Sequence, residues 1–500
     1  MVDPMRRSRL PFAALALLGA LPLVRARADA PARTQAALAE RIERIVSAAG
    51  FKSGRLGVLV LSLDDGSTVY EKDADVPLIP ASTAKLATSA AALDLLGPGH
   101  EFATTLDATG EGPSSDGVVA GDLVLHGSGD PGLSKRDHPA DPLWPLSSLA
   151  AQAAARGVKK VEGALVLDDG PFDRVFLHPS WLASDLDDWY GAPIAGLTFN
   201  DSCVTVLVRG GAADGAAATV TAPSTSGPWP IVAAVSTSDV RQPTVGAMWV
   251  EERRRLRIAG EIGPRQEATF DTPVPDPLAL CGGAMIEALT RAGISVGRGV
   301  RLAASAADRA RGVEVGRVTN PLRTVLRVMN KRSQNLYAEL LFKGAGAEAF
   351  GTGSFETGER AVAKVLERRG IPTAGVRVVD GSGLSKDNRL SAGALARLLL
   401  SFDRDRVAGP ILFESLGVPG EEGTLAKRFK GVPGRDRIRA KTGTLGKSGV
   451  HALAGAVEGR ARPGAEASRG YAFAILINGA PAKGDPRSFE EDVVRQILSE

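Results

Sequence analysis

Apolar and polar positions follow different periods along the chain, and these periods predict its first elements. Residues 34–49 repeat apolar positions every three to four residues, which is typical of an amphipathic helix. Residues 55–75 alternate on either side of a DDG turn at 64–66, and this pattern predicts two strands joined in a hairpin. Residues 79–97, IPASTAKLATSAAALDLLG, then predict a helix of small and apolar residues, suited to burial.

The pattern changes near residue 100 and changes back near residue 275. Between these points the chain has short strands separated by glycine-rich turns, and after them helical patterns return before a final alternating segment and a last helix. The simplest interpretation is an α+β fold in which both ends of the chain form one domain around a β-rich insertion. We expect these divisions: a signal peptide at 1–30, one domain from 31–98 and 296–500, and an insertion at 99–295, itself divided into 99–130 with 195–295 and 131–194.

The first thirty residues have the pattern of an export signal. A basic start, MVDPMRRSR, precedes the apolar stretch LPFAALALLGALPLV, and ARADA then offers small residues at the spacing of a cleavage site. The apolar stretch is short for a bilayer span, although an uncleaved anchor is the alternative. We therefore predict a periplasmic protein, with at most peripheral membrane contact.

Charge, cysteine and histidine usage exclude several classes of function. The net charge of +3 is accounted for by the first thirty residues, so the rest offers no basic excess for nucleic acid. Cys203 and Cys281 are interpreted as buried thiols rather than a disulfide, and the five histidines lack metal-ligand spacing. The GSGDPG stretch at 127–132 matches a dinucleotide motif, but Pro131 and the following residues do not predict the helix that such a site needs.

Ser82 and Lys85 are the first candidates for chemistry. They lie three residues apart at the start of the predicted helix 79–97, which places them one turn apart on the same face. A serine hydroxyl needs a neighbouring base to become a nucleophile, and burial among alanines and leucines lowers the pKa of a lysine enough for it to act as that base. The alternative is a capping serine beside a lysine that extends to solvent.

Two later motifs favour the catalytic interpretation. Ser333 and Asn335, in SQN, lie at a break between two helical patterns, where a hydroxyl and a carboxamide can relay a proton and hold a substrate amide. The KTGT stretch from Lys441 to Thr444 lies on a predicted strand, where it can pair with a substrate and bind its carboxylate. An N-cap serine and an edge-strand lysine are the ordinary alternatives, but S-x-x-K, S-x-N and K-T-G occur in the order found in penicillin-recognising serine enzymes.

The sequence resembles the D-alanyl-D-alanine carboxypeptidase/endopeptidases, the class C low-molecular-mass penicillin-binding proteins. Members of this family insert extra domains between the first and second motifs, and half of this chain lies between Ser82 and Ser333. Further similar stretches are HGSGDPGLS (126–134), WYGAPIAGLTFNDSCVTV (189–206), DGSGLSKDNRLS (380–391) and GEEGTLAKRFKG (420–431). The resemblance implies a β-lactamase/transpeptidase-like domain with an antiparallel sheet flanked by helices.

The resemblance also implies a role for each motif residue. It implies that Ser82 is the nucleophile, Lys85 its general base, and Lys441 a support for the relay through Ser333 and Asn335. The substrate-binding residues would be Thr442, Gly443 and Thr444, with the backbone N–H groups of Ser82 and Thr444 as the oxyanion hole. Two departures stand out: Gln334 replaces the aspartate expected most often in the second motif, and the stretch after Thr444 is slightly longer than usual.

These roles describe a serine DD-peptidase that cleaves peptidoglycan stem peptides through an acyl-enzyme. The expected partners are peptidoglycan peptides and beta-lactam antibiotics, and no cofactor is implied. Two alternatives remain open: a β-lactamase of the same fold, although no suitable deacylating glutamate segment stands between the second and third motifs, and a catalytically silent wall-binding protein.

Overall fold

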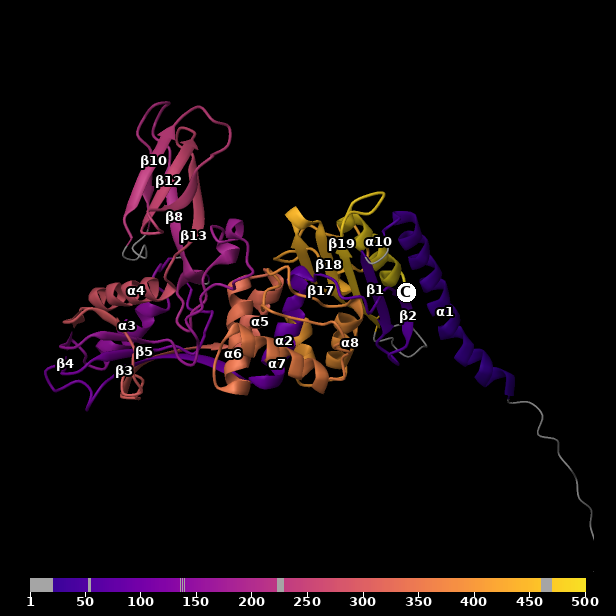
Figure 1. Cartoon of the computed structure of the whole chain (residues 1–500), viewed down its shortest axis with the longest axis horizontal. Coiled ribbons are helices and arrows are strands. Elements are labelled where there is room, and N and C mark those ends of the chain that lie inside the picture. The colour runs from indigo at the N-terminus through magenta and orange to yellow at the C-terminus, as the bar shows by residue number, and fades with distance from the viewer. Residues whose placement is uncertain are drawn as a thin grey trace, which may run out of the picture.

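A computed structural model describes residues 21–52, 55–134, 136, 138, 140–222, 229–459 and 470–500, with side chains from residue 35 onward except that of residue 447. Figure 1 shows a sheet-and-helix part that contains the C-terminus, an inserted part at the other end of the molecule, and a group of strands that projects from the insertion. The expected signal peptide lies largely outside the described residues. None of the helices within those residues has the length and apolar character needed to cross a membrane.

Strands from both ends of the chain form the main sheet. It has five antiparallel strands in the order β17–β18–β19–β1–β2: β1 (Leu56–Ser62), β2 (Thr68–Lys72), β17 (Ile438–Leu445), β18 (Val450–Glu458) and β19 (Gly470–Asn478). All seven residues of β1 are buried because helices cover both faces of the sheet, and this explains its nearly continuous apolar sequence LGVLVLS. The predicted hairpin at 64–66 is confirmed, since β1 pairs directly with β2.

The two faces of this sheet carry different helices. One face is covered by α1 (Leu21–Ala49) and α10 (Pro486–Leu498). The other is covered by α8 (Ala392–Asp403), behind which lie α2 (Lys85–Leu95), α5 (Leu322–Lys331), α6 (Asn335–Phe350), α7 (Phe355–Arg368) and α9 (Ala408–Ser415). Helix α2 contacts α6 and α7, and its buried residues include every position from 85 to 93. A helix made mostly of small and apolar residues is thus placed in the centre of a helical layer, as its composition requires.

The insertion is built on a second five-stranded sheet. The order is β15–β7–β5–β3–β16, from β3 (Glu101–Ala108), β5 (Leu123–His126), β7 (Leu165–Asp168), β15 (Val300–Leu302) and β16 (Val313–Pro321). Helices α3 (Leu146–Ala155) and α4 (Pro277–Arg291) share its core, and three short strands form a small sheet: β4 (Val118–Val119), β6 (Lys160–Val161) and β14 (Ser295–Val296). Strands β5 and β7 pair with each other although the expected division at 131 lies between them. Strands β15 and β16 also belong to this sheet, although both lie after residue 296, where the main domain is expected to resume.

Two three-stranded sheets form the projecting part of the insertion in Figure 1. One contains β8 (Cys203–Arg209), β9 (Thr219–Thr221) and β13 (Glu267–Pro273), and the other contains β10 (Ile231–Thr237), β11 (Gly246–Val250) and β12 (Arg255–Ile262). Cys203 begins β8 and Cys281 lies in α4; both are buried and free, so the interpretation of two buried thiols is confirmed.

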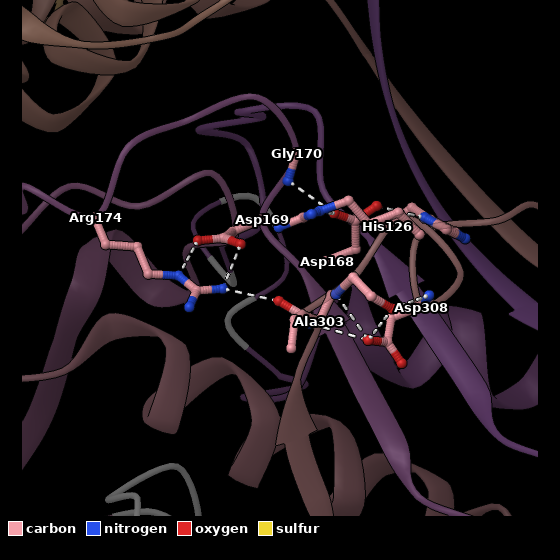
Figure 2. A network of polar contacts seen from close by, with 10 residues as sticks. His126, Asp168, Asp169, Gly170, Arg174, Ala303 and Asp308 are labelled. Atoms are coloured by element: carbon pink, nitrogen blue, oxygen red, sulfur yellow. Dashed lines mark hydrogen bonds and ion pairs between the residues drawn. The ribbon is translucent and has the colours of Figure 1, made fainter.

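A buried polar network ties loops to the insertion sheet (Figure 2). His126 Nδ1 lies 2.8 Å from Asp168 Oδ2 on the neighbouring strand. Burial by itself would raise the pKa of Asp168, but its contacts with the histidine and with a backbone N–H outweigh burial and hold the pKa below its usual value. Arg174 makes two hydrogen bonds to Asp169, of 2.9 and 3.0 Å, and also donates to the Ala303 carbonyl. Because buried polar groups need partners, these contacts fix where the loops cross the sheet.

Candidate active site

Ser82 and Lys85 meet at the start of α2. Ser82 lies in a 3-10 turn, Ala81–Ala84, that runs directly into the helix, and Lys85 Nζ lies 3.1 Å from Ser82 Oγ. Ala81 has a φ of 47°, a left-handed conformation that alanine rarely adopts, so the backbone beside the serine is strained. The spacing therefore produces the hydroxyl–amine contact that the sequence predicts.

Lys85 is completely buried and held by three oxygens. Its Nζ lies 2.7 Å from Asn335 Oδ1 and 2.8 Å from the Ser382 carbonyl, in addition to Ser82 Oγ. Burial disfavours the ammonium form and lowers the pKa of Lys85 to about 7, against the opposing attraction of two buried carboxyl groups. A lysine in this position is charged only part of the time at neutral pH, so it can accept a proton.

The second and third motifs meet through Ser333 and Lys441. Lys441, at the centre of β17, is also completely buried, and its Nζ donates to Ser333 Oγ at 2.9 Å and to the Thr442 carbonyl at 2.8 Å. Burial and the nearby Lys85 both lower the pKa of Lys441 well below its usual value. Ser333 has a φ of 60°, so both serines of the site stand in or beside a strained turn.

Strand β17 approaches the nucleophile turn closely because Gly443 has no side chain. A Cβ built on Gly443 would lie only 2.8 Å from the Pro80 carbonyl oxygen, too close for any real side chain. The missing side chain thus permits a close backbone approach, and the approaching backbone belongs to the residues before Ser82. Thr444, the next residue of the strand, is exposed and lines the same cleft as Ser82.

The eight candidate residues thus converge on one cleft of about 490 Å³. Ser82, Ser333, Asn335 and Thr444 line it directly, while Lys85 and Lys441 lie beneath its surface and Thr442 Oγ1 bonds Thr424 Oγ1 at 2.8 Å on its rim. Asp185, Tyr190, Leu384 and Lys386 complete much of the wall. The cleft therefore combines an activatable hydroxyl, two buried amines and a strand with an exposed threonine.

Several contributing residues carry no assigned role in the sequence analysis. The Ser382 carbonyl bonds Lys85, the Tyr190 carbonyl accepts a hydrogen bond of 2.9 Å from Asn335 Nδ2, and Thr424 contacts Thr442. Glu339 accepts hydrogen bonds from the Gly381 and Ser382 N–H groups, and burial raises its pKa to about 8. Ser382, Tyr190 and Thr424 lie in stretches that mark the family resemblance, which is their only signal in the sequence. Ser382 and Tyr190 act through backbone carbonyls, which leave no trace in residue type.

The unusual residue Gln334 has a clear partner in the insertion. Its Nε2 donates to Asp201 Oδ2 at 2.9 Å, and the same carboxylate is paired with Arg136. Asp201 is the middle of three consecutive left-handed residues, with Asn200 and Ser202. Burial raises the pKa of Asp201 despite the nearby arginine. An aspartate at position 334 would place a second carboxylate against Asp201, so glutamine fits this neighbour and aspartate does not.

We therefore expect Gln334→Asp to weaken both stability and catalysis. Two carboxyl groups would compete for Arg136, with an expected loss of about 1–3 kcal/mol in the free energy of unfolding and slower acylation of Ser82, because Ser333 and Asn335 flank the altered residue. The measurement is thermal unfolding together with the rate of labelling by a fluorescent penicillin. The double variant Gln334→Asp/Asp201→Asn restores a donor–acceptor pair and should recover much of both losses; if it recovers neither, the contact does not explain the glutamine.

Comparison with known proteins agrees with this geometry. Residues 38–497 match the model of the D-Ala-D-Ala carboxypeptidase 3 (S13) family. A D-alanyl-D-alanine carboxypeptidase from Actinomadura sp. (strain R39) is 34% identical over 491 residues, covering 94% of this chain and 86% of the relative. Carboxypeptidase DacB from Mycolicibacterium smegmatis is 29% identical over 470 residues, covering 91% and 83%.

The fold agrees as well. The crystal structure of penicillin binding protein 4 (dacB) from Haemophilus influenzae superimposes with a TM-score of 0.75 at 23% identity, covering 92% of this chain and 98% of the other. The expected α+β, β-lactamase/transpeptidase-like fold with an insertion is thereby confirmed. With a family match that spans nearly the whole chain, this protein belongs to the D-Ala-D-Ala carboxypeptidase 3 (S13) family.

Proposed function

We propose that this protein is a serine DD-peptidase that cleaves the D-Ala peptide bond of peptidoglycan stem peptides through an acyl-enzyme. The observation that carries the proposal is the 3.1 Å contact between Ser82 Oγ and the completely buried Lys85 Nζ. A buried amine beside a hydroxyl is an arrangement for making a nucleophile. The relative from Actinomadura sp., named a D-alanyl-D-alanine carboxypeptidase, supports the substrate class.

In the acylation step, Ser82 Oγ attacks the carbonyl carbon and its proton passes to neutral Lys85. A neutral amine has two N–H donors and one lone pair; the donors are taken by Asn335 Oδ1 and the Ser382 carbonyl, which leaves the lone pair for the serine O–H. The tetrahedral oxygen would be held by the N–H groups of Ser82 and Thr444. The surroundings of Lys85 thus orient the amine as an acceptor toward Ser82.

The carbon–nitrogen bond then breaks, and the leaving amine needs a proton. Ser333 is placed to deliver one, because its hydroxyl accepts a hydrogen bond from Lys441 and can donate its own hydrogen into the cleft. Thr442 and Thr444 would bind the terminal carboxylate of the substrate, with the buried Lys441 amine behind them. Ser333 regains its proton from the Lys85 ammonium, which leaves Lys85 neutral again. Water then attacks the ester and gives a proton to Lys85, which passes it to Ser82 Oγ as the ester breaks, so Ser82 is restored.

Beta-lactams would acylate Ser82 by the same route. Their ring opens without releasing a leaving group, so the opened product remains beside the ester and hydrolysis is slow. The expected partners are therefore peptidoglycan peptides and beta-lactam antibiotics, and the expected location is the periplasm, reached through the signal peptide predicted at 1–30.

We expect the acylation rate to depend on pH through Lys85. Only the neutral amine accepts a proton, so with a pKa of about 7 the reactive fraction falls about tenfold per pH unit below 7 and is nearly constant well above it. Labelling by a fluorescent penicillin should thus be about 100-fold slower at pH 5 than at pH 8.5. A rate that continues to rise tenfold per unit beyond pH 9 would show that Lys85 titrates as an ordinary exposed lysine.

Digestion of purified peptidoglycan tests the proposed function. Loss of pentapeptide monomers with release of free D-alanine shows carboxypeptidase action, and conversion of cross-linked dimers to monomers shows endopeptidase action. Rapid turnover of a chromogenic cephalosporin would favour the β-lactamase alternative. Binding to sacculi with neither product release nor penicillin labelling would favour a silent wall-binding protein.

A further inference from the structure

A second cavity, of about 660 Å³, lies beside the catalytic cleft. The two hollows share Trp189 and Arg332 as wall residues, and the second motif separates them. Ser333 and Asn335 line the catalytic cleft, whereas Gln334 between them lines the second cavity. A molecule that extends past Arg332 can therefore occupy both hollows.

The proposed mechanism places this cavity toward the leaving side of the reaction. Ser333 would give its proton to the departing nitrogen, and its neighbour Arg332 is, with Trp189, one of the two wall residues that the catalytic cleft shares with the second cavity. Asn335, which would hold the acyl part of the substrate, lines the catalytic cleft and not the second cavity. When the leaving group is one D-alanine, no further space is required; when it is a second stem peptide, the chain must continue somewhere beyond Ser333.

The walls of the cavity suit a peptide with charges of both signs. Its apolar surface comes from Trp189 and Phe270, its cationic surface includes Arg332, and exposed carboxylates include those of Asp187 and Asp271. The Arg332 ion pair with Glu422, at 3.1 Å, is at the surface and costs little to exchange for another carboxylate. Stem peptides present carboxylates and amino groups on short aliphatic chains, which matches this combination.

Part of the cavity wall is a connected polar group. Asp201 joins Arg136 to Gln334, and its carboxylate is carried by the middle of three left-handed residues, 200–202. Such strain persists only where surrounding contacts enforce one conformation. The cavity is therefore built jointly by the insertion and by the second catalytic motif.

We propose that this cavity is the subsite for the leaving stem peptide of a cross-linked dimer, and that the insertion thereby gives the enzyme its endopeptidase action. The inference rests on the proposed function, since it needs a scissile bond at Ser82. It predicts that cleavage of dimers, but not release of D-alanine from monomers, depends on the cavity walls.

The test compares two reactions in the same variants. Asp271→Arg reverses an exposed charge in the wall and extends a long side chain into the cavity, and its matched control is Thr269→Arg, exposed on the same strand but outside the cavity. Ala247→Phe fills the cavity from β11, and its control is Met248→Phe, which faces the opposite side of that strand and is 59% exposed. Each protein is assayed for D-alanine release from a pentapeptide, conversion of purified dimers and penicillin labelling.

We expect the ratio of dimer conversion to D-alanine release to fall at least tenfold in Asp271→Arg and Ala247→Phe and to stay within twofold in both controls. A ratio unchanged in all four variants, or an equal fall of both reactions in the cavity variants, overturns the inference. A wild-type protein that releases D-alanine but leaves dimers intact also overturns it, while the proposed function stands. A wild-type protein with neither reaction and no penicillin labelling overturns the proposed function itself.

Discussion

Replacing Ser82 with alanine should abolish both D-alanine release and penicillin labelling. The expected loss is about 10⁶-fold, the size found when a serine nucleophile is removed from an enzyme whose other catalytic groups remain, so activity should be undetectable. Ser82 is only partly buried, and within the part of the chain that the structure describes its hydroxyl bonds Lys85 and makes no other contact that supports the fold, so the variant should fold normally. The measurements are free D-alanine from a pentapeptide, and the mass increase of the protein after incubation with penicillin.

Ser401→Ala is the matched control. Ser401 lies on α8, where its hydroxyl donates to the Leu398 carbonyl, and it does not line the cleft, so both activities should be unchanged. Penicillin labelling that survives in Ser82→Ala would show that another residue is acylated. Labelling lost in both variants would show that a nonspecific change of the protein, rather than the loss of the nucleophile, is responsible.

The sequence predicts this site well because its chemistry is carried by residue types at fixed spacings. Ser82 and Lys85 meet because three residues span one helical turn, and Gly443 allows β17 to approach because any side chain there would collide with Pro80. The hairpin and the helix of small residues follow equally directly from periodicity. The order of the motifs and the resemblance are the only signals that residues 79–97, 333–335 and 441–444 converge. No local pattern indicates contacts between segments so far apart in the sequence.

Other features depend on contacts that residue type does not encode. The Gln334–Asp201 contact joins the second motif to the insertion, and neither residue signals the other along the chain. One of the three hydrogen-bond partners of Lys85 is the Ser382 backbone carbonyl, and any residue type provides such a carbonyl. The divisions of the insertion also depend on long-range pairing: β5 and β7 belong to one sheet although a helix and a long loop separate them, so the domain boundaries proposed from composition remain predictions.

Replacing Lys85 with methionine should reduce the rate of acylation by about 10³- to 10⁴-fold, the upper range for loss of a general base. Methionine matches the length of the lysine stem and avoids the cost of burying an amine, but it leaves Asn335 Oδ1 and the Ser382 carbonyl without their donor. Thermal unfolding checks that the variant is folded. Lys85→Gln is the companion variant, because its amide can donate to those oxygens and yet cannot accept a proton from Ser82.

This prediction also separates the two buried amines. Lys441 has a lowered pKa too, and it contacts Ser333 rather than Ser82, so it could serve as the base only if Ser333 passed the proton between them. If Lys85 is the base, the methionine and glutamine variants should both be slow at every pH, and the rise in rate toward pH 7 should disappear with the amine that causes it. If folded Lys85→Met keeps its rate within tenfold and retains that rise, the proton of Ser82 must leave through Ser333 to Lys441. The position of Lys85 argues against that route, because two of its three polar contacts are acceptors that leave its lone pair directed at Ser82.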